Sequence, residues 1–120
     1  MIRSITPTVY VSDLEAAVRF YGEVLGLKVA LHAPGHWASL AAPDGTNLGL
    51  HPAGPYSPRP GTAGAVQLGL AVDRPLEHVV TELKNRGVSF QGPVTDDTKV
   101  RLAFFKDPDG NTLYLCEVRG

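Results

Sequence analysis

The feature of this 120-residue chain that most limits its possible folds is an internal repeat. The segment PDGTNLGL at residues 43–50 recurs as PDGNTLYL at residues 108–115, an offset of 65. Upstream, the segments that end at Gly26 and Gly87 match at an offset of 61, so four residues are inserted between these two matches in the second copy. Repeated sequence indicates a repeated supersecondary unit. We therefore expect one βαβββ-type unit to occur twice.

The repeat divides the chain into two modules, residues 1–51 and 64–120, which we expect to form a single domain over residues 1–120. Residues 52–63, PAGPYSPRPGTA, are rich in proline and glycine and predict a linker without regular structure. Each module is expected to contain a strand, a helix and then three strands. The PDG segments predict turns between the last two strands of each module.

Start and stop signals delimit the two expected helices. The first is expected to begin at Ser12, with Glu15 completing a capping box, and to end at Gly26 in a left-handed conformation. The second is expected to begin around Pro75 and to end at Gly87. Both helices place leucine and valine on one stripe, which predicts that each covers one face of a sheet.

Alternate residues along the expected strands fall into two sets. The first set is entirely aliphatic, and we expect it to pack against the helices: Val9, Val11, Leu48, Leu50, Leu68, Leu70, Val72, Leu113 and Leu115. The second set is polar or small: Thr6, Thr8, Tyr10, Asn47, Gly49, His51, Gln67, Gly69, Ala71, Thr112, Tyr114 and Cys116. A solvated face would favour Lys, Glu and Arg, which are absent from the second set. We therefore favour a lined cavity over a merely solvated face.

Charge and cysteine content narrow the classes of partner. The net charge is −1, with acidic and basic residues interspersed, so we expect no nucleic-acid partner and no membrane association. The single cysteine cannot form an internal disulfide, and the N-terminal residues lack a secretion-signal pattern. We expect a cytoplasmic protein whose partner is a small molecule.

Three runs of sequence carry a resemblance to a known family: VSDLEAAVRFYGEVLGLKV, LGLAVDRPLEHVVTELKNRGV and FFKDPDGNTLYLCEV. They resemble the vicinal oxygen chelate superfamily, which includes glyoxalase I, extradiol dioxygenases, fosfomycin resistance enzymes and bleomycin resistance proteins. The resemblance implies an α+β fold of two tandem βαβββ modules, whose curled mixed sheets form an open barrel-like cavity. It also implies a homodimer, with the barrels closed within one chain or across swapped subunits.

In metal-dependent members of the family, the positions that match Thr6, Gly49, Gln67 and Tyr114 hold the metal ligands. Divalent metals bind imidazole, thiolate or carboxylate groups, and these four residues supply none of them. We therefore expect no metal and no cofactor. The resemblance then points to the bleomycin-resistance branch, whose members sequester a drug without a metal.

The leading hypothesis is a metal-independent binding protein for a drug or metabolite, with a polar and aromatic cavity and no assigned catalytic residue. The expected ligand-binding residues are Thr6, Thr8, Tyr10, Trp37, Ser39, Gly49, His51, Gln67, Phe104 and Tyr114. For Trp37, a place in the ordinary core remains an equal alternative. The alternative function is an enzyme: a glyoxalase-like lyase or dioxygenase that uses a divalent metal through atypical ligands, such as His51 or Cys116, or a metal-free enzyme with His51 or Tyr114 as acid or base. A purely structural partner domain is a third possibility.

Overall fold

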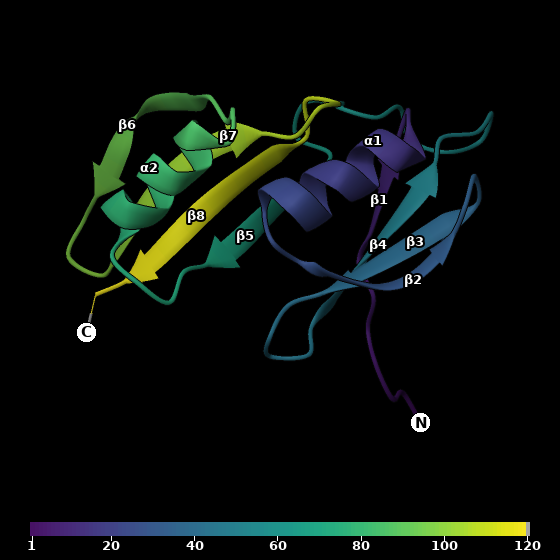
Figure 1. Cartoon of the computed structure of the whole chain (residues 1–120), viewed down its shortest axis with the longest axis horizontal. Coiled ribbons are helices and arrows are strands. Elements are labelled where there is room, and N and C mark those ends of the chain that lie inside the picture. The colour runs from purple at the N-terminus through teal and green to yellow at the C-terminus, as the bar shows by residue number, and fades with distance from the viewer. Residues whose placement is uncertain (120) are drawn as a thin grey trace. The chain divides into compact units, whose positions relative to one another are not determined.

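The computed structural model describes residues 1–119, and the chain divides into two compact units on either side of the bond between Thr62 and Ala63. Each unit contains one four-stranded mixed sheet and one helical segment. In Figure 1 the first unit runs from purple to blue-teal and the second from teal to yellow. The division falls at the end of the proline-rich segment 52–63. Each unit corresponds to one copy of the sequence repeat.

The first unit begins with a strand and a helix and continues with three strands. Its elements are β1 (Thr8–Val11), α1 (Leu14–Arg19), the π-helical turn η1 (Phe20–Val24) that continues α1, β2 (Lys28–Ala33), β3 (Trp37–Ala41) and β4 (Asn47–Pro52). The strand order is β1-β4-β3-β2, with β1 parallel to β4 and the other neighbours antiparallel. The helical segment is therefore the crossover that a parallel pair of strands requires.

The second unit repeats this topology. Its elements are β5 (Gln67–Ala71), α2 (Leu76–Asn85), β6 (Phe90–Asp96), β7 (Val100–Lys106) and β8 (Thr112–Val118). The strand order is β5-β8-β7-β6, again with one parallel pair, β5 and β8. The predicted α+β fold with two tandem βαβββ modules is confirmed. Neither sheet closes on itself, because each keeps two edge strands.

The two PDG turns have the same backbone structure. The N–H of Gly45 donates to the carbonyl of Ala42 at 2.9 Å, and the N–H of Gly110 donates to the carbonyl of Asp107 at 3.0 Å. Gly45 has a φ of +90° and Gly110 a φ of +89°, the left-handed conformation that glycine adopts without strain. The repeated tripeptide thus encodes the same turn twice, as predicted.

The first helix is capped by a different residue from the one expected. Asp13, not Ser12, is the N-cap, and its side chain accepts a hydrogen bond from the N–H of Ala16 at 3.1 Å. The predicted capping box is therefore wrong, because the helix begins one residue later and Glu15 lies in its first turn. Glu15 instead approaches the side chain of His32, at 3.0 Å, and so links α1 to β2.

The second helix begins after Pro75, which is its N-cap. Both helical segments are followed by a glycine with positive φ, +83° at Gly26 and +95° at Gly87. The predicted glycine stops are confirmed. They turn the chain back toward the second strand of each module.

Each core lies between the helix and the aliphatic face of its sheet. Helix α1 contacts β3 and β4, and α2 contacts β7 and β8. The fully or almost fully buried members of the aliphatic set are Val9, Val11, Leu50, Leu113 and Leu115, whereas Leu48, Leu68, Leu70 and Val72 are half-buried. Full burial of one such side chain stabilises the fold by about 1.5–3 kcal/mol. The predicted helix-facing set is confirmed.

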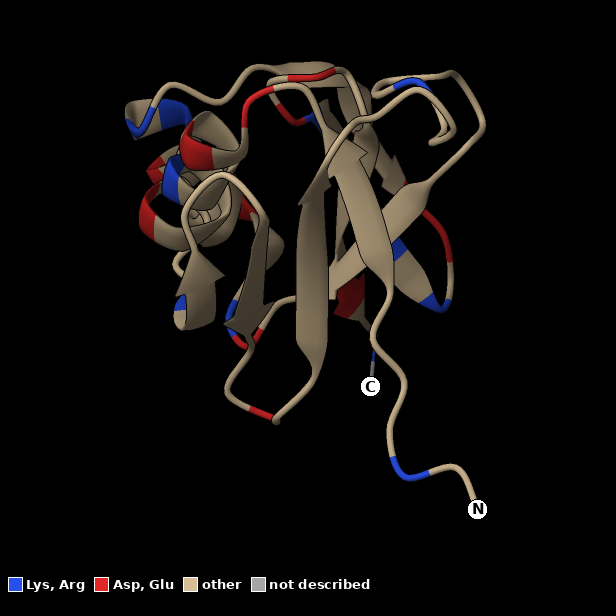
Figure 2. Cartoon of the chain, turned by 90° about the vertical axis from the view of Figure 1, so that its right-hand side faces the viewer, with Lys and Arg blue, Asp and Glu red and all other residues tan. Residues whose placement is uncertain are grey.

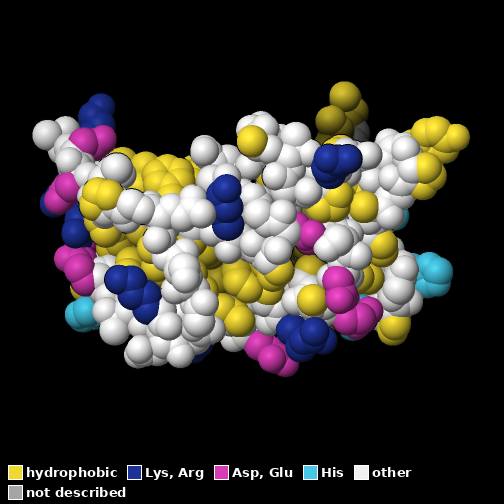
Figure 3. Space-filling model, turned by 90° about the horizontal axis from the view of Figure 1, so that it is seen from above, with side chains coloured by type: hydrophobic (Ala, Val, Ile, Leu, Met, Phe, Trp, Pro, Cys, Tyr) yellow, Lys and Arg dark blue, Asp and Glu magenta, His cyan; other side chains and the backbone are white. Residues whose placement is uncertain are grey.

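β1, β3 and β4 contain no Lys, Arg, Asp or Glu. The charged residues of the other strands are Lys28 on β2, Asp96 on β6, Arg101 and Lys106 on β7, and Glu117 on β8. Figure 2 shows charged positions on helices, turns and strands. On the surface seen in Figure 3, basic and acidic side chains are interspersed with apolar and uncharged ones. Within residues 1–119, no helix is both long enough and apolar enough to span a membrane.

Candidate functional site

The face of the first sheet that points away from the helix brings together six of the residues expected to bind a ligand. Strand pairing places Thr8 opposite Gly49, Tyr10 opposite His51, and Ser39 opposite Gly49. Trp37 shares the parity of Ser39 on β3. The six residues, which we call face 1, are Thr8, Tyr10, Trp37, Ser39, Gly49 and His51. None of them is Asp, Glu, Lys or Arg.

Trp37 lies directly over the backbone of Gly49 on the neighbouring strand. A Cβ atom added at Gly49 would lie 2.2 Å from Cη2 and 2.9 Å from Cζ2 of the indole, closer than side-chain carbons approach one another. The ring therefore occupies the space that any larger residue at position 49 would need. Trp37 is half-buried on the face opposite the helix, so the alternative that it belongs to the helix-side core is wrong.

His51 forms the outer part of the same aromatic cluster. Its ring centroid lies 5.4 Å from that of Tyr10 and 6.3 Å from that of Trp37. Its Nδ1 lies 2.8 Å from the carbonyl oxygen of Pro52. A carbonyl oxygen can only accept, so a proton lies on Nδ1, and in the tautomer with this single ring proton Nε2 keeps a lone pair. Nε2 of His51 is thus a hydrogen-bond acceptor that lies beside the rings of Tyr10 and Trp37.

The corresponding face of the second sheet holds the other three strand residues expected at the site. We call this surface face 2; it contains Gln67 on β5, Phe104 on β7 and Tyr114 on β8. Phe104 is paired with Tyr114, and their ring centroids are 5.4 Å apart at an interplanar angle of 42°. An added Cβ at Gly69, the strand partner of Tyr114, would lie 2.5 Å from the tyrosine Oη. Tyr114 therefore lies across Gly69.

In both faces an aromatic ring lies over a glycine of the neighbouring strand, but the strands involved are shifted by one position in the sheet. In face 1 the ring extends from β3 onto a glycine of β4, whereas in face 2 it extends from β8 onto a glycine of β5. Gly49 and Tyr114 hold equivalent positions in the repeat, yet one supports a ring and the other is the ring. This difference explains why the two nearly identical segments differ at that residue.

Thr6 is the one expected site residue that the sheet does not hold. β1 begins at Thr8, and Thr6 is exposed before it. In the second module the parallel pairing begins with Gln67 opposite Thr112, two residues before Gly69 and Tyr114, the pair that matches Thr8 and Gly49. The residue after Thr6 is Pro7, which has no N–H to donate to a neighbouring strand, so the parallel ladder starts later in the first module.

A divalent metal does not fit the positions where the family holds one. Thr6 and Gln67 offer a hydroxyl and a neutral amide, which are poor ligands for such ions, and Gly49 offers no side chain. The space above Gly49 is filled by Trp37. Over the described residues, no three His, Cys, Asp or Glu side chains gather closely enough to hold a metal ion.

Cys116 lies beside a shallow surface hollow of the second module. The hollow is lined by residues 71–75 and 116–118, which include Asp73, Arg74 and Glu117. The thiol is half-buried and in the reduced form. It has one carboxylate neighbour on its own strand and no imidazole in the hollow lining, so it does not supply an atypical metal site.

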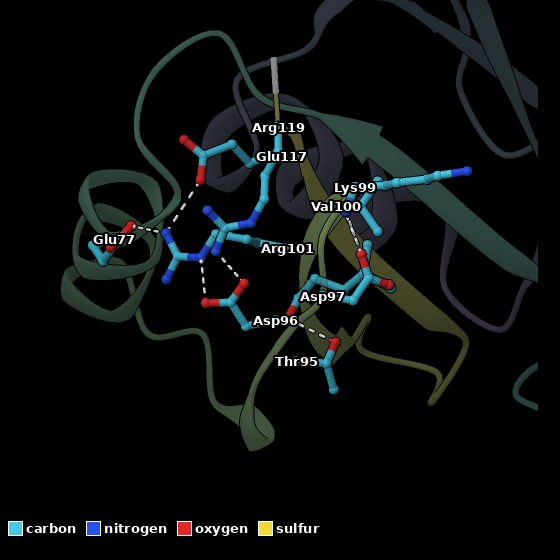
Figure 4. A network of polar contacts seen from close by, with 10 residues as sticks. Glu77, Thr95, Asp96, Asp97, Lys99, Val100, Arg101, Glu117 and Arg119 are labelled. Atoms are coloured by element: carbon cyan, nitrogen blue, oxygen red, sulfur yellow. Dashed lines mark hydrogen bonds and ion pairs between the residues drawn. The ribbon is translucent and has the colours of Figure 1, made fainter.

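An ionic network centred on Arg101 in the second module was not anticipated from the sequence. Arg101 on β7 donates to Glu77 of α2 at 2.6 Å and to Glu117 of β8 at 3.2 Å, and its side chain is only 18% exposed (Figure 4). Hydrogen bonding to Glu77 raises the pKa of Arg101 and lowers the pKa of Glu77. Asp96 of β6 also faces the guanidinium, at 3.5 Å. Arg101 shares the parity of buried Phe105, which was the available signal that it faces the helix.

Comparison with known proteins adds three findings. A family model described as the Glyoxalase/Bleomycin resistance protein/Dioxygenase superfamily matches residues 3–115. Virulence protein STM3117 of Salmonella typhimurium is 31% identical over 113 residues, which cover 89% of this chain and 78% of that protein. The crystal structure of TnmS3, an antibiotic binding protein from Streptomyces sp. CB03234, is 32% identical with a TM-score of 0.82 and covers 99% of this chain and 98% of its own.

A second solved structure is that of a member of the Glyoxalase/bleomycin resistance protein/dioxygenase superfamily from Sphaerobacter thermophilus DSM 20745. It is 27% identical to this chain, has a TM-score of 0.80, and the match covers 98% of each chain. The matches extend over both modules.

Proposed function

The chain belongs to the Glyoxalase/Bleomycin resistance protein/Dioxygenase superfamily, and on that premise we propose that it binds a small molecule without a metal ion. Faces 1 and 2, each considered by itself, offer the proposed ligand contacts, and the ligand would be sequestered with no chemical change. An antibiotic or a metabolite of similar character is the proposed ligand class. The description of the similar protein TnmS3 as an antibiotic binding protein supports this choice.

One observation carries the proposal. By the family resemblance, position 49 matches one that holds a metal-coordinating residue in metal-dependent members. In this chain it is glycine, and the space for a side chain is filled by the indole of Trp37. Tyr114 occupies the equivalent position in the second module and lies across Gly69. Aromatic rings that lie over strand glycines offer contact area for a ligand rather than coordination for a metal.

The chemistry of face 1 favours an uncharged ligand. Phosphate or carboxylate ligands are normally met by Arg, Lys or a metal, and β1, β3 and β4 contain neither Arg nor Lys. Arg101 does not fill that role, because its guanidinium is engaged by Glu77 and Glu117 on the helix side.

We extend the proposal to assembly and location. A homodimer is supported by the edge strand β2, which exposes Val29 at 41% and Leu31 at 55%. Light scattering coupled to gel filtration tests it, and a mass of one chain, 12.8 kDa, would contradict it. A cytoplasmic location and the lack of a nucleic-acid or membrane partner are proposed from the near-neutral charge and the single free cysteine.

Thermal unfolding of chelator-treated protein tests the proposed function. A ligand that binds only the folded state adds about 2.7 kcal/mol at 100 times its Kd, a shift of several degrees for a chain of this size. We expect no shift with Ni, Zn, Mn or Fe(II), and a clear shift with at least one compound of an antibiotic and metabolite library. That compound should be recovered unchanged. One metal ion bound per chain with a clear rise in Tm would refute the proposal. Chemical conversion of the bound compound would refute it too.

A metal-free enzyme is the second candidate, and one observation favours it. The hydrogen bond from Nδ1 of His51 to the Pro52 carbonyl fixes the tautomer in which Nε2 can accept a proton. As an enzyme, the protein would convert its ligand, and His51→Ala would abolish turnover while binding persisted. Recovery of an unchanged ligand from the wild type would reject this candidate.

A further inference from the structure

We infer that face 1 contains a subsite for an uncharged planar ring that carries an O–H or N–H donor at its rim. Trp37 is the platform for the ring, Gly49 is the positioning residue that holds the platform, and Nε2 of His51 accepts the donor hydrogen. This inference rests on the proposed binding function and specifies the ligand class for one of the two faces.

Gly49 is present for space and not for backbone conformation. Glycine in the interior of a strand is unfavourable, because it loses more conformational freedom on folding and provides no side chain to pack. Gly49 does not have a positive φ, so its backbone would suit any residue. The feature that requires glycine is the approach of the indole, since a Cβ would lie 2.2 Å from Cη2 of Trp37 and 3.0 Å from Oγ1 of Thr8.

The platform has a covered side and an accessible side. Atoms Cη2 and Cζ2 of the indole lie over Gly49, and Trp37 is nevertheless only half-buried, so part of the ring stays open to a ligand. His51 meets the indole in an edge-to-face arrangement, with an interplanar angle of 62°. A flat ligand placed on the accessible part of the indole would therefore have its rim beside the imidazole.

His51 selects the polarity of the ligand. The Pro52 carbonyl takes the Nδ1 proton, so the neutral imidazole presents Nε2 as an acceptor. Ring substituents that donate, such as a phenolic O–H or an amide N–H, match it, whereas an ether oxygen does not. The absence of Lys and Arg from β1, β3 and β4 leaves no countercharge for an anionic ring.

Isothermal titration with a matched probe pair tests the inference. 2-Naphthol and 2-methoxynaphthalene have the same ring system and differ in that a methyl group replaces the donor hydrogen. The wild type should bind 2-naphthol about five- to tenfold more tightly, the fold-change that one net hydrogen bond produces. His51→Phe retains an aromatic ring without the acceptor and should equalise the two probes.

The glycine is tested by its effect on the ring above it. Gly49→Ala should weaken the binding of both probes and change the fluorescence emission of Trp37, which is the only tryptophan of the chain. Gly22→Ala is the matched control, because its added Cβ would meet nothing nearer than 3.6 Å. Gly69→Ala disturbs the ring of face 2 and should leave the preference between the probes unchanged.

The outcomes separate this inference from the proposed function. Equal binding of the two probes by the wild type would refute the role of His51 as the hydrogen-bond acceptor. A preference that survives His51→Phe would refute it too. Unchanged emission and binding in Gly49→Ala overturns the positioning residue. If library compounds bind but neither naphthalene does, the inference fails and the proposed function stands. If nothing binds, both fail. His51→Phe leaves Gly49 in place, so the acceptor is tested even where Gly49→Ala does not fold.

Discussion

Replacement of Asp107 by alanine should destabilise the second module by much more than a change in a turn usually does. Asp107 is only 6% exposed, and its carboxylate accepts hydrogen bonds from the N–H groups of Asp109 and Asn111, at 3.0 and 2.8 Å. It also accepts one from Nδ2 of Asn111 at 2.9 Å, and Asn111 is only 4% exposed. Alanine would remove the acceptor for all three donors.

The magnitude follows from these three bonds. A hydrogen bond to a charged group contributes about 1.5–3 kcal/mol, and a buried donor left without a partner costs about 1–3 kcal/mol. The contributions within one cluster are not additive, and the N–H of Asp109 is near enough to the surface to gain water. We therefore expect a loss of about 3–5 kcal/mol in the free energy of unfolding. For a chain of this length the loss lowers Tm by roughly 10–20 °C.

The first module supplies the matched control. Its turn has Ala42 where the second has Asp107, and Thr46 where the second has Asn111. The hydroxyl of Thr46 donates to Asp44 at 2.7 Å and so needs no carboxylate at position 42. The double variant Asp107→Ala with Asn111→Thr should therefore recover part of the loss, as measured by urea unfolding. A single-variant loss below about 1 kcal/mol, or no recovery in the double variant, would refute the reasoning.

Two further predictions concern the core and the ionic network. Leu40→Ala should cost about 2–5 kcal/mol in urea unfolding, because Leu40 is fully buried, whereas Val118→Ala, at a residue 70% exposed, should change stability by about 0.5 kcal/mol or less; equal losses would contradict the assigned burial. The guanidinium of Arg101 lowers the pKa of Glu77 below its ordinary value of 4.5, so the stabilisation by this carboxylate is present above that pH and lost as pH falls through the lower folded value. Glu77→Gln should therefore be less stable than the wild type at neutral pH, with the difference closing as the pH falls below 4.5 and through the lowered pKa of Glu77, and a difference that persists in strong acid would contradict this role of Glu77.

The topology could be predicted because the information for it is local and occurs twice. Alternation of apolar residues identified the helix-facing set, and the glycines at 26 and 87 ended the helices where expected. The helix start was misplaced by one residue because Ser12 and Asp13 are both good caps. Only the path of the backbone decides between them.

The placement of the aromatic rings could not be derived in the same way. Whether Trp37 faced the core or the opposite side depended on the register between β3 and β4, which sets its distance from Gly49. The network of Arg101 has the same origin, because Glu77 and Glu117 come from elements far apart in sequence. Pairs of residues that meet across strands leave no periodic signal along the chain.

The hydrogen bond between His51 and Pro52 has a consequence for the exchange of modules between relatives. Pro52 is the last residue of β4, and the next residue, Ala53, donates its N–H to the carbonyl of Val11 at 2.9 Å. The start of the linker therefore belongs structurally to the first sheet. A chimera joined before Pro52 would replace the carbonyl group that orients the His51 imidazole. A junction beyond Ala53 would transfer the first module together with this hydrogen bond.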